Sequence, residues 1–212
     1  ASQTFSEWFR EIKSTPRPSV TRELVVFFHD TFMEYNDPQI GQAAIKVLQA
    51  IGFEPIVLYD KKDSGRPAVS KGLLDDASML ARHNLALLAP FAKQGIPIVG
   101  CEPSVMAMLV DDYPDLVSGD GADVQANAEA VASQAMLLET LVLQSSKKKE
   151  LALKFDQKPR RVLFHGHCQQ KATFGVESTV KLLELIPNCT VEEVDSGCCG
   201  MAGSFGYERE HY

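Results

Sequence analysis

Three of the five cysteines stand where their thiols could act together. Cys168 ends the apolar run RVLFHGHC, and Cys198 and Cys199 follow 30 residues later (198 − 168) in the glycine-rich sequence SGCCGMAGSFG. Neighbouring cysteines rarely bridge each other, because the small ring strains the intervening peptide bond. Thiolates bind soft metals, and glycines let the backbone close around a ligand. The pattern favours a soft-metal site over a disulfide, and a set of buried, inert thiols is the alternative.

These two segments resemble the CCG-type cysteine-rich domain of iron–sulfur oxidoreductases. The family pattern is a cysteine, a later Cys-Cys-Gly sequence and a final Cys-x-x-Cys, and it usually occurs twice in a chain. The likeness covers nearly all of the chain from Thr4. It is greatest to the C-terminal region of fused FAD-linked oxidases that act on D-lactate, D-2-hydroxyglutarate, glycolate and similar 2-hydroxy acids.

The resemblance implies that Cys168, Cys198 and Cys199, followed by Gly200, bind an iron–sulfur cluster of the 4Fe-4S type in the intact protein. The remaining family cysteines would lie beyond Tyr212, so we interpret the chain as a piece of a longer protein. A cluster with missing thiolates is expected to be absent from this piece by itself.

His165 and His167 flank Cys168 in the turn after the apolar run. Either imidazole could ligate the metal, or hydrogen-bond a cluster sulfide and raise its potential. The equally simple alternative is that these rings satisfy backbone groups of the turn. Cys189 matches no position of the family, and we expect it in the core.

The resemblance also implies electron transfer as the function. A flavin in upstream FAD and ferredoxin-like domains of the same polypeptide would take two electrons from a 2-hydroxy acid, and iron–sulfur centres would relay them singly to an acceptor. We find no FAD-binding stretch here and expect no turnover by this piece alone. Two alternatives stay open: a docking or scaffold module whose cysteines bind zinc or nothing, and heterodisulfide-reductase-like thiol/disulfide chemistry at the cluster.

The elements that must position these residues alternate between strand and helix. Apolar runs typical of buried strands lie at 23–30, 54–60, 96–104 and 160–168. Helices are expected at 39–52, 70–95, 105–113, 126–144 and 176–187, after an N-terminal helix with its apolar residues at helical spacing. This alternation predicts an α/β fold of two tandem βαβ-type, Rossmann-like repeats with parallel sheets, the second repeat truncated. We divide the chain into an N-terminal helical connector (1–19), a cysteine-degenerate first repeat (20–120), a helix and linker (121–159) and a second CCG repeat (160–212).

The first repeat has lost most of its thiols. Thr31 takes the place of the first family cysteine, and Asp63 and Ser64 that of the vicinal pair, at intervals of 32 (63 − 31) and 30 residues (198 − 168) in the two repeats. Cys101 remains from a degenerate Cys-x-x-Cys. Hard oxygen ligands cannot replace bridging thiolates, so this repeat should hold no cluster and should serve as a scaffold or contact the upstream flavin domain.

The strand ends of the first repeat could still form a polar site. We expect Cys101 at the end of the third strand, near Thr31 and Ser64, as a buried, small apolar residue. His29, Asp63 and Glu102 could together form a polar cleft there, because ligands of open α/β sheets bind at the carboxyl ends of strands.

The composition limits the kinds of partner and the compartment that we expect for the chain. The formal net charge of −7 argues against a nucleic acid or an anionic membrane surface as partner. No apolar run is long enough to span a bilayer, and we find no signal peptide. An odd number of cysteines fits a reducing compartment, so we expect a cytoplasmic protein, with peripheral attachment at the inner membrane face as the variant.

Overall fold

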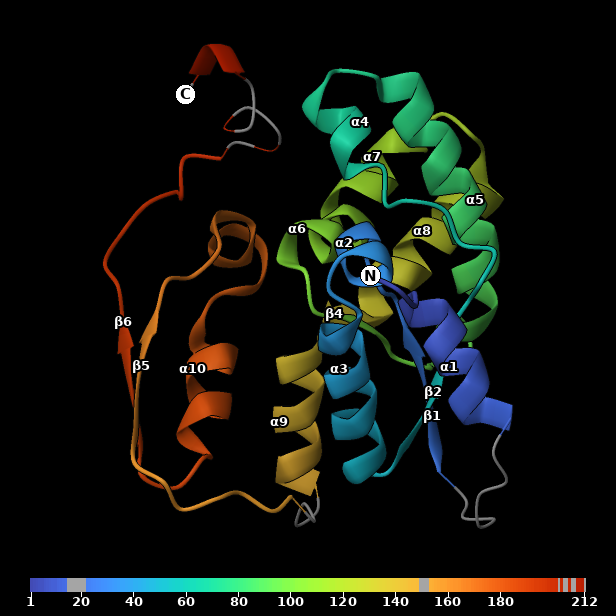
Figure 1. Ribbon diagram of the computed structural model, residues 1–212. Coiled ribbons are helices and arrows are strands. Elements are labelled where there is room, and N and C mark those ends of the chain that lie inside the picture. The colour runs from blue at the N-terminus through green and yellow to red at the C-terminus, as the bar shows by residue number, and fades with distance from the viewer. Residues whose placement is uncertain (15–21, 149–152, 202, 204–205, 207–208, 212) are drawn as a thin grey trace.

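The strands form two separate parallel sheets. The computed structural model describes residues 1–14, 22–148, 153–201, 203, 206 and 209–211. One sheet has four strands in the order β2-β1-β3-β4, and the other pairs β5 with β6 (Figure 1). All pairings are parallel, so the predicted α/β class with parallel sheets is confirmed.

The elements follow one another along the chain as expected for strands linked by helices. The strands are β1 (Glu23–Phe27), β2 (Phe53–Ile56), β3 (Ile98–Gly100), β4 (Ala135–Leu137), β5 (Arg160–Phe164) and β6 (Cys189–Glu193). The α-helices are α1 (Phe5–Ser14), α2 (Thr31–Tyr35), α3 (Pro38–Ala50), α4 (Arg66–Ser70), α5 (Leu74–Ala92), α6 (Pro103–Ala107), α7 (Tyr113–Leu116), α8 (Ala122–Gln134), α9 (Leu138–Lys148) and α10 (Glu177–Glu184). Two π-helical segments, η1 (Met108–Asp112) and η2 (Gln170–Phe174), and a 3₁₀ turn, η4 (Arg209–His211), complete the described part.

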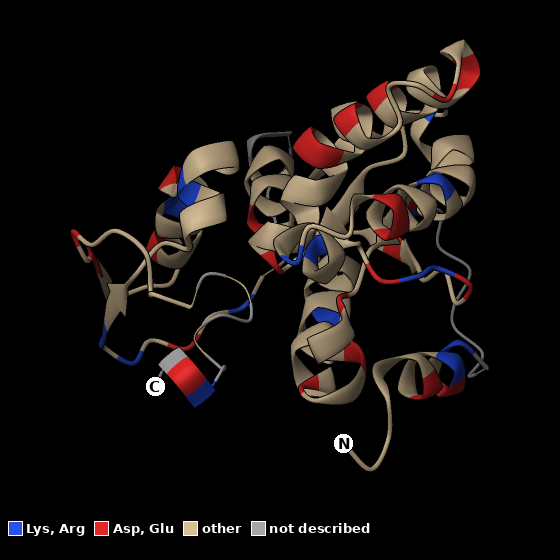
Figure 2. Ribbon diagram, turned by 90° about the horizontal axis from the view of Figure 1, so that it is seen from above, with Lys and Arg blue, Asp and Glu red and all other residues tan. Residues whose placement is uncertain are grey.

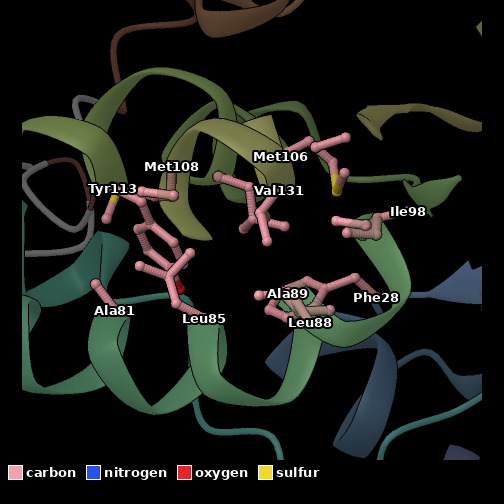
Figure 3. Close-up of a cluster of buried hydrophobic side chains, with 14 of the residues drawn as sticks. Phe28, Ala81, Leu85, Leu88, Ala89, Ile98, Met106, Met108, Tyr113 and Val131 are labelled. Atoms are coloured by element: carbon pink, nitrogen blue, oxygen red, sulfur yellow. The ribbon is translucent and has the colours of Figure 1, made fainter. Parts of the chain in front are cut away.

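The four-stranded sheet is covered on both faces. Because side chains alternate along a strand, Val25 and Phe27 of β1 face the cluster formed with α1, α3 and α9. Val26 and the following Phe28 face the opposite cluster, in which α5, η1 and α8 pack. Figure 3 shows this second cluster, where side chains of α5 meet those of η1 and α8. Burial on both faces explains why β1 is a continuous apolar run.

Local signals set several boundaries. Pro38 occupies the first turn of α3, where a missing N–H costs nothing, and Gly52 follows the helix with φ +95°, a conformation that favours glycine. Asp30 caps α2, because its side chain accepts a hydrogen bond from the Met33 N–H at 2.9 Å. The sharp turn after β1 therefore starts a helix at Thr31. Residues 15–18, a Thr-Pro-Arg-Pro sequence that disfavours a continued helix, lie outside the described residues.

The prediction of one uninterrupted helix over 126–144 is wrong. Ala135–Leu137 form β4, which pairs with β3 in the register Ile98↔Ala135 and Gly100↔Leu137, between α8 and α9. Helix propensity amounts to only a few tenths of a kcal/mol per residue, whereas the free edge of β3 offers a row of unpaired backbone groups. After η1, Tyr113–Leu116 form the short helix α7, with Pro114 in its first turn.

The prediction that the strand before Cys168 is buried is also wrong. Every residue of β5 is exposed or half-buried, and Leu163 keeps 62% of its surface accessible. The cause is the small size of this sheet. Helix α10 packs against β6 on one side and against α9 on the other, so it covers one face of the sheet and leaves the outer face open (Figure 1).

The two halves share a topology. In each, a strand leads through a short helical segment (α2 or η2) and a longer helix (α3 or α10) to a parallel partner strand. This is the arrangement that an internal duplication predicts.

Acidic and basic residues are mixed along the helices and loops (Figure 2). None of the described helices is both long and apolar enough to cross a bilayer.

Candidate metal centre

The structure brings Cys168 and Cys198 together at one edge of the small sheet. Cys168 follows β5 and Cys198 follows β6, and since these strands are parallel, both residues lie beyond their carboxyl ends. The Cys168 thiol is hydrogen-bonded with Cys198. Its pKa is raised, first by burial and then by that hydrogen bond and by the charges of Cys198 and Cys199. Cys168 therefore points toward the vicinal pair.

All three thiols are accessible. Cys168, Cys198 and Cys199 are exposed and are not engaged in disulfides, so the alternative of buried, inert thiols does not hold for them. The Gly200 N–H donates to the Cys198 sulfur at 3.4 Å, and Gly200 has φ +85°, a conformation that side chains rarely adopt. The glycine after the pair thus lets the backbone turn a donor toward a cysteine sulfur.

The three thiols are the kind of ligand that a soft metal prefers. They do not, however, all face one point at which a metal could sit. Exposed thiols with a nearby backbone N–H are the ligands that iron–sulfur clusters use. Among the described residues, however, no three His, Cys, Asp or Glu side chains stand close enough together to hold a metal ion. Two of the three predicted ligands are in contact, and Cys199 would have to turn toward them.

The two histidines contact backbone and the first half of the chain. His165 Nε2 lies 3.3 Å from the Gly197 carbonyl oxygen, which is the backbone role that formed the alternative to metal ligation. His167 Nδ1 accepts from the Gln169 N–H at 3.2 Å, and its Nε2 lies 4.0 Å from Glu102 Oε1. His167 therefore links the turn that bears Cys168 to the segment that follows β3.

The remaining cysteines lie apart from this edge. Cys189 is half-buried at the start of β6, the opposite end of the strand, and is less enclosed than the core position expected for it. Cys101 follows β3 at the carboxyl edge, as predicted, and packs against the core, although it is half-buried and not fully buried as expected. Burial, with smaller effects of Glu139 and Asp30, raises the pKa of Cys101 to about 12, which keeps it a protonated thiol at neutral pH.

The degenerate positions of the first half also contact one another. The Thr31 hydroxyl donates to Asp63 Oδ2 at 2.6 Å, so the residues in place of the first two family cysteines form a pair as Cys168 and Cys198 do. Ser64 is buried, and its hydroxyl accepts from the Arg66 N–H at 3.3 Å. The same strand ends carry soft donors in one half and hard donors in the other.

The strand ends form the predicted polar cleft from His29 and Asp63, but Glu102 does not line it. A hollow of about 130 Å³ lies beyond β1 and β2 and includes His29 and Asp63, whereas Glu102 lines a second hollow of about 220 Å³ beyond β1 and β3, with Cys101 and Phe32. Sequence reasoning missed Lys61 and Glu34 in the first hollow. The charged run that follows the second strand could have indicated the lysine, because it stands at a strand end.

Comparison with known proteins points to oxidoreductases. No family model matches the chain. It is 30% identical over 210 residues, 99% of the chain and 50% of the relative, to a subunit of the anaerobic glycerol-3-phosphate dehydrogenase of Escherichia coli K12. It is 31% identical over 194 residues, 89% of the chain and 18% of the relative, to a D-2-hydroxyglutarate dehydrogenase of Haemophilus influenzae. Lactate utilization protein A of an Exiguobacterium strain is 24% identical over 171 residues, 79% of the chain and 67% of the relative.

These relatives agree with the resemblance drawn from the cysteine motif. The chain spans about half the length of the first of them and 18% of the second. By fold and by similarity, it corresponds to a part of proteins named as dehydrogenases or as agents of lactate utilization.

Proposed function

We propose that this chain is an iron–sulfur electron-transfer module of a flavin-dependent oxidoreductase that oxidises a 2-hydroxy acid. The observation that carries the proposal is the contact between Cys168 and Cys198, beyond parallel strands, with Cys199 adjacent. The dehydrogenase names of the relatives support the class of reaction. When bound, a 4Fe-4S cluster would supply a one-electron carrier between flavin and acceptor.

Each residue of the site has a definite task in this proposal. Cys168, Cys198 and Cys199 would be the thiolate ligands, and the Gly200 N–H would stabilise negative charge on the Cys198 sulfur. A further ligand would come from another part of the protein, as would the FAD and ferredoxin-like domains. The first half (20–120) and the segment to 159 would form the support on which the second repeat (160–212) rests.

The test uses the complete protein that contains this chain, prepared without oxygen. We expect iron and sulfide in equal amounts, a broad visible absorption band that bleaches on reduction, and loss of one cluster's share of the iron in Cys168→Ser and Cys198→Ser. Cys189→Ser is the matched control, because Cys189 lies at the other end of β6, and it should keep its iron. Zinc in place of iron would support a docking module, and full iron content in Cys168→Ser would contradict the ligand assignment.

The same contact supports a second candidate, thiol–disulfide chemistry. Two thiols already within hydrogen-bond distance could be oxidised to a disulfide while an external disulfide is reduced to two thiols. Incubation with oxidised glutathione followed by mass spectrometry tests this candidate. A Cys168–Cys198 crosslink in the cluster-free protein that glutathione reverses would favour it, and mixed glutathione adducts alone would not.

A further inference from the structure

The first half retains a polar hollow where the second half carries its thiols. The hollow measures about 130 Å³ and opens beyond β1 and β2. Its lining is almost entirely polar or charged and includes Ser6, His29, Thr31, Glu34, Lys61 and Asp63. The carboxyl edge of a parallel sheet is the usual position of a ligand site in α/β proteins.

Lys61 brings an unpaired positive charge to this hollow. Its side chain is half-buried, and its ammonium makes no hydrogen bond or ion pair with any of the residues that the structure describes. It lies over the Phe28 ring, 5.0 Å from the centroid. Burial lowers the pKa of Lys61, although Asp63, Glu34 and Asp30 act in the opposite direction. The ammonium is accessible from the hollow and has no acceptor among the described protein groups, so it can donate to a ligand there.

The nearby carboxylates are engaged elsewhere. Glu34 Oε2 accepts from the Ser6 hydroxyl at 2.8 Å and the Ser6 N–H at 3.1 Å, and it lies 3.2 Å from His29 Nε2. Asp63 Oδ2 accepts from the Thr31 hydroxyl at 2.6 Å. Their charges are thus held by O–H and N–H donors of the protein, which weakens their repulsion of a second anion.

His29 also has a ring nitrogen without a hydrogen-bond partner among the described residues. Its side chain is only 4% exposed, and the nitrogen without a partner is Nδ1. Burial, with a smaller effect of Lys61, lowers the pKa of His29 to about 3, so the ring is neutral. Because Nε2 faces the Glu34 carboxylate and carries the proton, Nδ1 is an acceptor that lacks a donor. Because Nδ1 is shielded from solvent, a ligand in the hollow does not reach it, which leaves the Lys61 ammonium as the group that can bind one.

Hydrogen bonds from α5 hold the loop that carries Lys61 in place. Asn84 of α5 accepts from the Lys62 N–H at 2.9 Å and donates to the Asp63 carbonyl at 3.0 Å. Its amide also donates to the Tyr113 hydroxyl, which donates to the Ser64 carbonyl at 3.0 Å. Buried polar groups that are fully paired fix the backbone, so the site is preformed.

We propose that this hollow binds a small oxyanion, a phosphate or a carboxylate, through the Lys61 ammonium. The degenerate half would then have exchanged a thiolate metal site for an anion site at the same strand ends. This inference does not depend on a cluster in the second half. Hydrogen phosphate, which carries more negative charge and more acceptor oxygens than acetate, should bind the ammonium more tightly.

Isothermal titration calorimetry with inorganic phosphate and with acetate tests the proposal. The titrations use the cluster-free chain at pH 7, at constant ionic strength balanced with chloride. We expect saturable binding at one site in the wild type and at least about tenfold weaker binding in Lys61→Met. Lys93→Met removes an exposed lysine just after α5 and is the matched control, which should bind as the wild type does.

A measurement on the wild type guards against a misfolded variant. In ¹³C-lysine-labelled protein, phosphate should shift the Lys61 side-chain signal saturably and raise its pKa, because a bound anion stabilises the ammonium. No saturable heat, equal binding by Lys61→Met with native circular dichroism, or shifts spread over many lysines would overturn the proposal. If the iron measurements on the complete protein contradicted the cysteine ligands, the phosphate-binding measurements would still test this proposal.

Discussion

At the scale of the residue, two chemically different sites stand at equivalent strand ends. Thr31 and Asp63 form a hydrogen-bonded pair in the first half, and Cys168 and Cys198 form one in the second. Oxygen donors suit hard ions and hydrogen bonds, whereas thiols suit soft metals and redox chemistry. A few substitutions at these positions are therefore enough to change what the edge can bind.

His29 should make stability depend on pH. Its pKa is about 3 in the folded chain and 6.5 in the unfolded chain, so the unfolded state binds more protons between these values. The stability contributed above pH 6.5 is lost as the pH falls toward 3, by at most about 1.4 kcal/mol per unit. In urea unfolding, the wild type should lose more stability between pH 7 and pH 5 than His29→Gln, whose amide can still donate to Glu34. Equal losses would mean that His29 is not kept neutral.

Tyr113 should be sensitive to loss of its hydroxyl alone. The residue is fully buried, and its hydroxyl links Asn84 to the Ser64 carbonyl. Tyr113→Phe leaves both partners buried without it, which should cost about 1–3 kcal/mol of unfolding free energy. Chemical denaturation measures this loss. Tyr35→Phe is the control, because Tyr35 is exposed, and its stability should stay within about 0.5 kcal/mol of the wild type.

At the scale of the element, α1 is held by close packing against α3. Phe5 is fully buried and Phe9 almost so, and both pack with Phe27 of the sheet in one cluster. At Gly41 of α3, a Cβ atom would stand 2.6 Å from Phe5 Cδ2 and 2.8 Å from Met33 Sδ. The absence of a side chain at this position lets the two helices approach each other.

Substitution of Gly41 by alanine should therefore destabilise the chain. The overlap with Phe5 costs about 1–3 kcal/mol, which exceeds the gain of roughly 1 kcal/mol from better helix propensity. We expect a lower denaturation midpoint and faster hydrogen exchange in α1. Gly119→Ala is the control, because nothing lies within 4 Å of the added atom there. A Gly41→Ala variant as stable as that control would show that α1 is not packed as described.

At the scale of the whole molecule, a buried polar cluster joins the halves. Gln170, two residues after Cys168, is 4% exposed, and its amide donates to Thr179 Oγ1 at 2.6 Å and to Glu139 Oε1 at 3.3 Å. Thr179 also donates to Glu139 at 2.7 Å. Glu139 lies in the first turn of α9, in the segment between the two halves, so this carboxylate anchors the helical segment that follows the thiol site.

Removal of that anchor should loosen the second half selectively. Glu139→Ala leaves the Gln170 amide without one acceptor, a loss of about 1–3 kcal/mol for a buried group. Hydrogen exchange should accelerate in β5, β6 and α10 and stay unchanged in β1 to β3. The control is Glu129→Ala on the exposed face of α8, which should leave all rates as they are. Uniform acceleration over both sheets would show that the halves unfold together.

The sequence by itself determined the features that depend on local pattern. The run of Val and Phe at 23–30 predicted a buried strand, and Pro38 and Gly52 predicted the ends of α3, since each acts through its own backbone. The spacing of Cys168 and the vicinal pair predicted their approach, because the carboxyl ends of parallel strands meet at one edge.

Only the tertiary structure decided which segments fill the remaining positions. Ala135–Leu137 became a strand because β3 offered an unpaired edge, and β5 stayed accessible because a single helix covers its sheet. The same holds for Lys61, whose ammonium can bind a ligand because the fold forms a hollow beside it. Its neighbours His29 and Glu34 come from another part of the chain, and their desolvation depends on α1 closing over them, which no local pattern encodes.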